Sequence, residues 1–113
     1  MDVAFRQIGD VAVVALRGPR LDADAAIRLK EELVRHAAPE AKIALDMAEV
    51  RSIDAVGCGA VVGLQKQIDG RGGKVKVFAL HPRVRTLFQM ARLHRHLEVY
   101  NHQAEAVQSF AVR

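Results

Sequence analysis

Apolar and polar positions divide the chain into short strand-like runs that alternate with longer segments of helical period. Residues 3–8 alternate imperfectly between apolar and polar side chains, Gly9-Asp10 is a turn pair, and residues 11–16 are apolar throughout. The pattern therefore predicts an opening hairpin. Its first strand should lie at the edge of a sheet and its second strand should be more central.

A first helix is predicted up to about His36. Asp22 or Asp24 can cap its start, because an aspartate side chain accepts hydrogen bonds from the free amides of the first helical turn. Pro39 is expected to close this unit. The predicted buried face of the helix consists of Ala25, Ala26, Leu29, Leu33 and Val34.

The stretch from Lys42 to Gly63 organises the rest of the chain. An apolar run at 43–45 predicts a short strand that is covered on both faces. After a polar turn, Asp54 can cap a second helix, which has so few polar groups that it should be buried on most sides. Its glycines are Gly57, Gly59 and Gly63. Each helical glycine costs roughly 1 kcal/mol relative to alanine, which indicates a close backbone approach by the sheet beneath or by a partner above.

The remaining segments complete an alternating pattern of strands and helices. Residues 74–80 predict a strand, Pro82 suits the first turn of a third helix, and residues 97–100 predict a short last strand before a closing helix at 103–110. The third helix is expected to point Val84, Leu87, Phe88 and, at the end of this face, Ala91 inward. The closing helix is expected to point Ala106, Val107 and Phe110 inward. We predict an α/β fold in a single domain spanning 1–113. Its mixed sheet has about four to five strands, a hairpin followed by parallel strands, with about four helices packed against it.

The composition is that of one small globular domain. The chain has 113 residues, 50% of them hydrophobic, and no apolar run approaches the roughly 20 residues that span a bilayer. The N-terminal segment has an early acid and no apolar core, unlike a secretory signal, and a single cysteine cannot form an internal disulfide. We therefore expect a cytoplasmic protein without membrane insertion.

The net charge is +4, and the basic residues lean toward the second half, where no acid occurs between Arg71 and Glu98. Such a run can bind nucleic acid or another anionic surface. Aromatic side chains that could stack on bases are scarce in it, because Phe78 and Phe88 both fit core positions. We interpret the run as a solvated face and expect no DNA binding.

The sequence contains no catalytic constellation. Cys58 lies at a helix start, where a thiolate would be stabilised, but a small buried residue is the preferred interpretation. His94 and His96 would face the same way on a strand, yet no cysteine or acid stands beside them to complete a metal site. Ser52 and Ser109 lack the setting of a nucleophile, and the glycine spacing does not fit a dinucleotide fingerprint. We expect no enzyme activity, no metal and no cofactor.

Four short motifs follow one another along the chain. The central one is a strand ending at Asp46, a turn, and then Ile53-Asp54-x-x-Gly57-x-Gly59. Residues 18–22 precede the first helix, residues 72–73 precede the strand at 74–80, and residues 92–97 lead into the last strand. In this order the motifs resemble those of STAS domains, the family of bacterial anti-sigma-factor antagonists. In regulated members, the residue two after the turn aspartate is a phosphorylated Ser or Thr. Here that position is Val56, preceded by Ala55.

The resemblance implies a regulatory protein-binding module. Its partner would be an anti-sigma factor with a serine kinase-like ATP-binding domain, and its binding would free a sigma factor. The implied partner-binding residues are Arg51, Ser52, Asp54, Val56, Gly57 and Ala60. We expect Gly57→Arg to abolish binding with the fold retained, and Val56 to act as a degenerate phosphorylation position.

Two alternatives stay open beside this interpretation. One is a STAS subunit of a transport or stress-signalling complex, and the other is a STAS domain that senses a small ligand or nucleotide, which only the basic run supports. The sequence also leaves a homodimer open.

The family usually has glycine where this chain has Arg92, after the third helix. Glycine readily takes the left-handed cap conformation, whereas arginine in that conformation would cost on the order of 1 kcal/mol. We therefore expect the third helix to end by another route.

Overall fold

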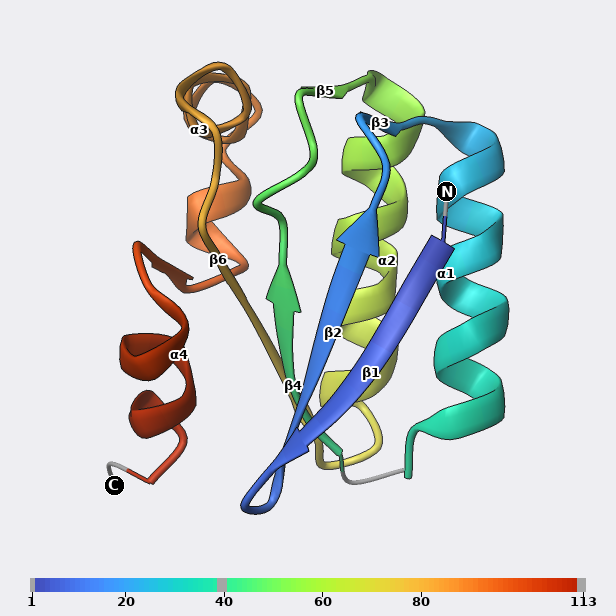
Figure 1. Ribbon diagram of the computed structural model, residues 1–113. Helices are drawn as coiled ribbons and strands as arrows, with labels where there is room; N and C mark the ends of the chain where they lie inside the picture. The colour runs from blue at the N-terminus through green and yellow to red at the C-terminus, as the bar shows by residue number, and fades with distance from the viewer. Residues whose placement is uncertain (1, 39–40, 112–113) are drawn as a thin grey trace.

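The computed structural model describes residues 2–38 and 41–111, so the expectation for Pro39 lies outside the described residues. A five-stranded sheet has the order β1-β2-β4-β6-β7 (Figure 1). Its strands are β1 (Asp2–Ile8), β2 (Val11–Arg17), β4 (Lys42–Asp46), β6 (Lys74–Phe78) and β7 (Val99–Tyr100). β1 and β2 are antiparallel, and every later pair in this sheet is parallel. The predicted mixed sheet, with its opening hairpin and edge strand, is confirmed.

In the part of the chain that the structure describes, four α-helices and one 3-10 turn pack around the sheet. They are α1 (Ala23–His36), α2 (Ala55–Asp69), α3 (Pro82–Met90), the 3-10 turn η1 (Leu93–Arg95) and α4 (Gln103–Ser109). Figure 1 shows α1 and α2 side by side, with α4 near the C-terminus. Pro82 opens α3 as predicted, because a proline at the first helical position loses no intrahelical hydrogen bond.

The central strand β4 is buried from both faces of the sheet. Ile43 and Leu45 belong to the large core cluster that α1, α2 and α3 complete. Ala44 points the other way and packs in a smaller cluster with Phe78 and with Ala106 of α4. Because successive side chains of a strand point to opposite faces, one apolar run fills both cores.

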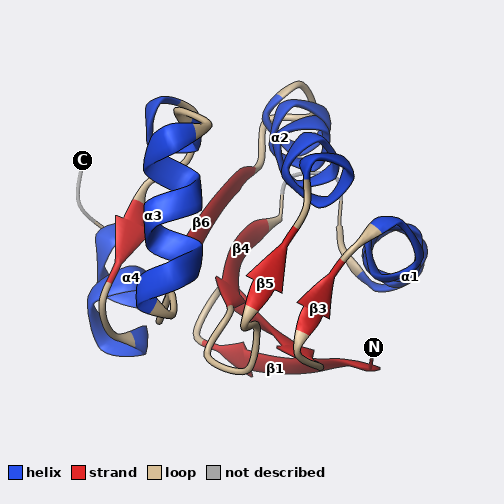
Figure 2. Cartoon of the chain, turned by 90° about the horizontal axis from the view of Figure 1, so that it is seen from above, coloured by secondary structure: helices blue, strands red, loops and turns tan. Residues whose placement is uncertain are grey.

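A second, two-stranded parallel sheet was not predicted. It pairs β3 (Arg20–Leu21) with β5 (Ser52–Ile53), and Figure 2 shows it leading into the starts of α1 and α2. The carbonyl of Pro19 accepts hydrogen bonds from the amides of Arg51 (2.8 Å) and Ser52 (3.0 Å). This contact fixes the starts of the two helices relative to each other.

Four helix expectations were wrong. Val34 is 60% exposed rather than inward, and Val56 at 58% shows that α2 is not buried on most sides. Ala91 and Leu87 are also exposed. Arg92 takes the left-handed conformation, with φ 59° and ψ 28°, so the third helix ends in the cap conformation that arginine was expected to avoid.

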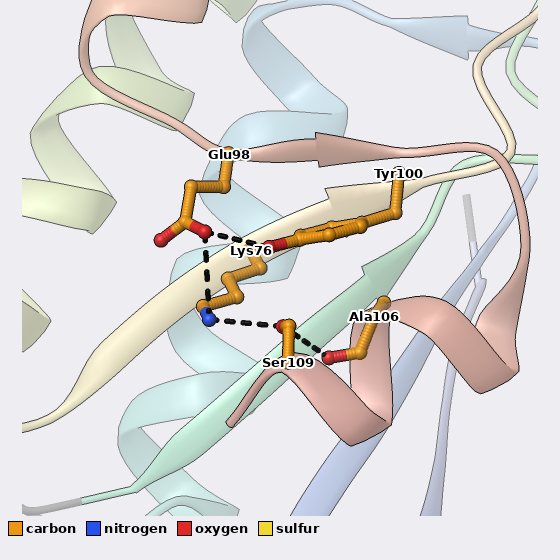
Figure 3. A network of polar contacts seen from close by, with 5 residues as sticks. All are labelled: Lys76, Glu98, Tyr100, Ala106 and Ser109. Atoms are coloured by element: carbon orange, nitrogen blue, oxygen red, sulfur yellow. Dashed lines mark hydrogen bonds and ion pairs between the residues drawn. The ribbon is translucent and has the colours of Figure 1, made fainter. Parts of the chain in front are cut away.

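The smaller face of the sheet holds a buried lysine that the sequence did not single out. Lys76 is 6% exposed, and its ammonium donates to Ser109 Oγ at 2.9 Å and lies 3.6 Å from Glu98 Oε1 (Figure 3). It also lies 4.5 Å from the ring centroid of Phe110, a cation–π distance. The Tyr100 hydroxyl donates to the same Glu98 oxygen at 2.6 Å. These contacts bind α4 to the sheet.

Candidate functional site

The start of α2 is a capped helix terminus at the end of the molecule where β3 and β5 lie. Asp54 Oδ1 accepts from the Gly57 amide at 2.7 Å, and the extended backbone of Asp54 marks it as the N-cap residue. Asp22 caps α1 in the same way through the Ala25 amide at 3.1 Å. The cap at Asp54 was predicted from the sequence, and the structure shows that Asp22, one of the two candidates, caps α1. The β3–β5 pair places the two caps next to each other.

The structure brings the predicted site residues together but gives them different exposures. Arg51, Ser52, Asp54 and Val56 are exposed, and Ala60 is half-buried one turn further along α2. Ser52 lies on β5, before the N-cap, whereas Val56 lies on the helix itself. The site therefore consists of a polar loop followed by an apolar helical turn.

Gly57 does not belong to this exposed surface, because it is buried. A Cβ at this position would lie 2.0 Å from the backbone oxygen of Leu21 and 3.0 Å from the Ile53 side chain. The close approach therefore comes from the protein's own strand β3. A Gly57→Arg protein would not keep the fold, so that expectation was wrong, and variants at Gly57 report on folding rather than on binding.

An apolar groove of about 350 Å³ runs between α1 and α2, next to the predicted site. Val56 and Ile27, each 58% exposed, lie along it, and Ala60 and Gly63 form part of its α2 wall. The sequence analysis missed Ile27, because that residue falls outside the inward stripe of α1. The available signal was its large apolar side chain among polar residues at helical spacing, Asp24, Lys30 and Glu31.

Cys58 is half-buried, and burial raises the pKa of its thiol. The nearby Asp54 carboxylate raises that pKa further. Both effects oppose the stabilisation that a helix start gives to a thiolate, so the thiol stays protonated at neutral pH. This environment fits a packing residue better than a redox switch.

The basic run from Arg71 to Arg95 is not one continuous surface. Lys76 is buried under α4, and Arg85 donates to the side-chain oxygen of Asn101 at 2.7 Å. His94 lies in η1 and His96 ends it, so the two imidazoles do not share a strand face as assumed. Within residues 2–38 and 41–111, no three His, Cys, Asp or Glu side chains gather in a metal-binding arrangement.

Residues 2–106 match the family model of the STAS domain. This chain belongs to the STAS domain family. The match spans the hairpin, the capped start of α2 and most of α4, so it includes every residue of the candidate site. None of the helices in the described part of this STAS domain is long and apolar enough to cross a membrane.

Solved structures share the fold of this STAS domain. An anti-sigma-factor antagonist (STAS) domain protein from Planctomyces limnophilus has a TM-score of 0.84 at 17% identity, covering 99% of this chain and 100% of that one. A sulfate transporter family protein from Wolinella succinogenes has a TM-score of 0.77 at 23% identity, covering 90% and 85%. The Bacillus cell fate determinant SpoIIAA in its phosphorylated form has a TM-score of 0.67 at 18% identity, covering 96% of this chain and 99% of that one. Antagonists and a transporter-family protein thus share this fold. The fold alone does not distinguish their roles, so an argument about function has to come from the surface residues of this chain.

Proposed function

We propose that this STAS domain is a non-enzymatic, anti-sigma-factor antagonist-like module that binds a regulatory protein in the bacterial cytoplasm. The proposed contact surface consists of Arg51, Ser52, Asp54, Val56 and Ala60. Gly57 supports it from beneath by letting α2 pack against β3. The partner that the family resemblance implies is an anti-sigma factor with a serine kinase-like ATP-binding domain.

The observation that carries the proposal is the exposure of Val56. Val56 is a branched apolar side chain, 58% exposed on the first turn of a capped helix, and it lies with the exposed Ile27 along one apolar groove, so the apolar surface here is contiguous rather than scattered. Charged and polar side chains of the loop before it, Arg51 and Asp54, border this apolar turn. An apolar centre with a polar rim is the usual anatomy of a protein interface.

The same residue removes the usual switch of the family. Val56 has no hydroxyl, and neither has Ala55, so neither side chain can accept a phosphoryl group. Ser52 is exposed but lies on β5 before the N-cap, away from the helical position. Because a displacement of even 1 Å from the attack geometry can cost about 100-fold in rate, Ser52 is a poor substitute. We infer a domain held in its binding-competent form and controlled by other means.

The test of the surface is the affinity of the anti-sigma factor for two arginine variants. Val56→Arg places a charge at the proposed centre, and we expect at least a tenfold loss of affinity by calorimetry, the scale of a hot-spot residue. Met90→Arg on α3 is the matched control, because Met90 is an equally apolar side chain, 76% exposed. Equal affinities for wild type and Val56→Arg would place the interface elsewhere.

A separate experiment tests the inference that the domain stays unphosphorylated, which we call the locked form. The intact mass of the protein is measured after incubation with the kinase-like partner and ATP. We expect the natural sequence to gain no phosphate. The Val56→Ser variant should gain one phosphate and release the partner when ATP is present. A stoichiometric phosphate on the natural chain, coupled to release of the partner, would refute the locked form while leaving the binding surface intact.

A further inference from the structure

The groove between α1 and α2 has the size and lining of a small-molecule site. Its volume of about 350 Å³ lies at the lower end of the roughly 300–1,000 Å³ that ligand pockets occupy. Buried residues of the two helices line it, including Leu29 of α1 and Val61 and Leu64 of α2. The exposed side chains of Ile27 and Val56 lie at its mouth.

Gly63 keeps the groove open at a cost to the stability of α2. A Cβ built on Gly63 would meet no atom within 4 Å, in contrast to Gly57, where the backbone of β3 excludes any side chain. Gly63 also lies well inside a 15-residue helix, where glycine costs roughly 1 kcal/mol relative to alanine. The packing of the domain therefore does not require glycine here, and a large side chain at this position would project into the groove.

The groove is electrostatically one-sided. Lys30 of α1 is the one charged residue among the described residues that line it, and Gln67 of α2 is the polar residue on the opposite wall. Lys30 is exposed and makes no ion pair within the described part of the chain. An apolar trough with a single ammonium group at its edge complements an apolar chain that carries one negative charge.

We propose that this groove binds an amphipathic anion with a linear apolar chain, a medium-chain carboxylate, whose head group pairs with Lys30. At about 30 Å³ for a water-sized group, the volume accommodates a chain of about ten to twelve such groups. The bound chain would cover Val56 and Ala60. If the proposed function is correct, ligand and protein partner would compete for these two residues, which offers control where phosphorylation is absent.

The test is an NMR titration of the isolated domain with octanoate, decanoate and dodecanoate below their micelle concentrations. We expect saturable shifts of the amides of Ile27, Lys30, Val56 and Gly63. The Kd should fall by up to about fourfold per added methylene until the groove is full, as apolar transfer predicts. Decylamine, which has the same number of carbons and the opposite charge, should bind several-fold more weakly.

Two leucine variants locate the site. Gly63→Leu should fill the groove, weaken decanoate binding at least tenfold and leave the fold intact, because no atom lies near the new Cβ. Gly59→Leu is the matched control, since Gly59 is equally open on the same helix but does not line the groove. Lys30→Glu should remove the preference for decanoate over decylamine.

The titration contains no protein partner, so its failure would not bear on the proposed protein-binding function. Absence of saturable shifts with all three acids would overturn the ligand site. So would equal decanoate affinity of wild type and Gly63→Leu, or shifts that cluster away from α1 and α2.

Discussion

The two faces of the sheet are built on different principles. The larger face, covered by α1 and α2, is apolar in its core, yet it leaves an open groove and exposes Ile27 and Val56. The smaller face has one short helix, α4, and buries the charged group of Lys76 in a complete set of contacts. The larger face therefore offers apolar surface to a ligand or partner, whereas the smaller face satisfies its polar groups within the chain.

Gly57→Ala should have the largest effect on stability, because Gly57 is where α2 packs directly against the backbone of β3. The added Cβ would lie 2.0 Å from the Leu21 carbonyl oxygen, a backbone atom that cannot move away without breaking the β3–β5 pair. We expect a loss of about 3 kcal/mol in the free energy of unfolding, at the upper end of overpacking effects. Urea denaturation gives the value. A loss near zero would mean that β3 is not held in place.

Lys76 tests the smaller face through a pair of variants. Lys76→Ala should destabilise by about 2 kcal/mol, because it removes the buried stem beneath α4 as well as the charge. Lys76→Met keeps most of the stem and should cost less than about 1 kcal/mol, since a buried ion pair often contributes little beyond an apolar side chain. Equal losses for the two variants would show that the ammonium contacts, not the packing, bind α4.

The smaller face should also respond to acid. The hydrogen bond from Tyr100 and the charges of Lys76 and Lys74 lower the pKa of Glu98 below its ordinary 4.5. A lowered carboxyl pKa in the folded state stabilises the fold above the ordinary pKa and loses that contribution as pH falls through the folded pKa. The stability that Glu98 gives through its contacts with Lys76 of β6 and Tyr100 of β7 should therefore decrease as the pH falls below 4.5.

Tyr100 provides a direct readout of this change, because the chain has one tyrosine and no tryptophan. Its fluorescence should report the loss of the Glu98 contact in acid, and Glu98→Gln should abolish the pH dependence in that range. An unchanged acid transition in Glu98→Gln would assign it to another carboxyl group.

Gly63→Ala should have the smallest effect, and in the opposite direction. Alanine fits the open space above α2, so we expect stabilisation by roughly 1 kcal/mol. Gly57→Ala and Gly63→Ala are the same chemical change in one helix. We expect them to change the free energy of unfolding in opposite directions when both are measured by urea denaturation. Destabilisation by Gly63→Ala would mean that the groove wall is closer than the geometry indicates.

Local signals in the sequence were sufficient for most of the fold. The Gly9-Asp10 turn, the caps at Asp22 and Asp54, and Pro82 at the start of α3 act within a few residues. Each could be found because a short-range hydrogen bond or dihedral preference determines it. The apolar run of β4 gave the central strand for the same reason.

Features that depend on long-range contacts could not be found in this way. The two-residue strands β3 and β5 are stabilised by their pairing, 32 residues apart in register at Arg20 and Ser52, and show no periodicity of their own. Whether Gly57 or Gly63 faces another backbone depends on where β3 passes. The burial of Lys76 depends on α4, which lies about 30 residues later in the chain. The groove is likewise a property of two helices together.

The most direct test of the proposed binding surface is an NMR titration of the labelled domain with the anti-sigma factor. We predict that the largest shifts fall on the amides of residues 51–60, from the loop into the first turns of α2, and that Val56→Arg suppresses them. Largest shifts on α4 or on the β1 edge, with residues 51–60 unaffected, would contradict the account.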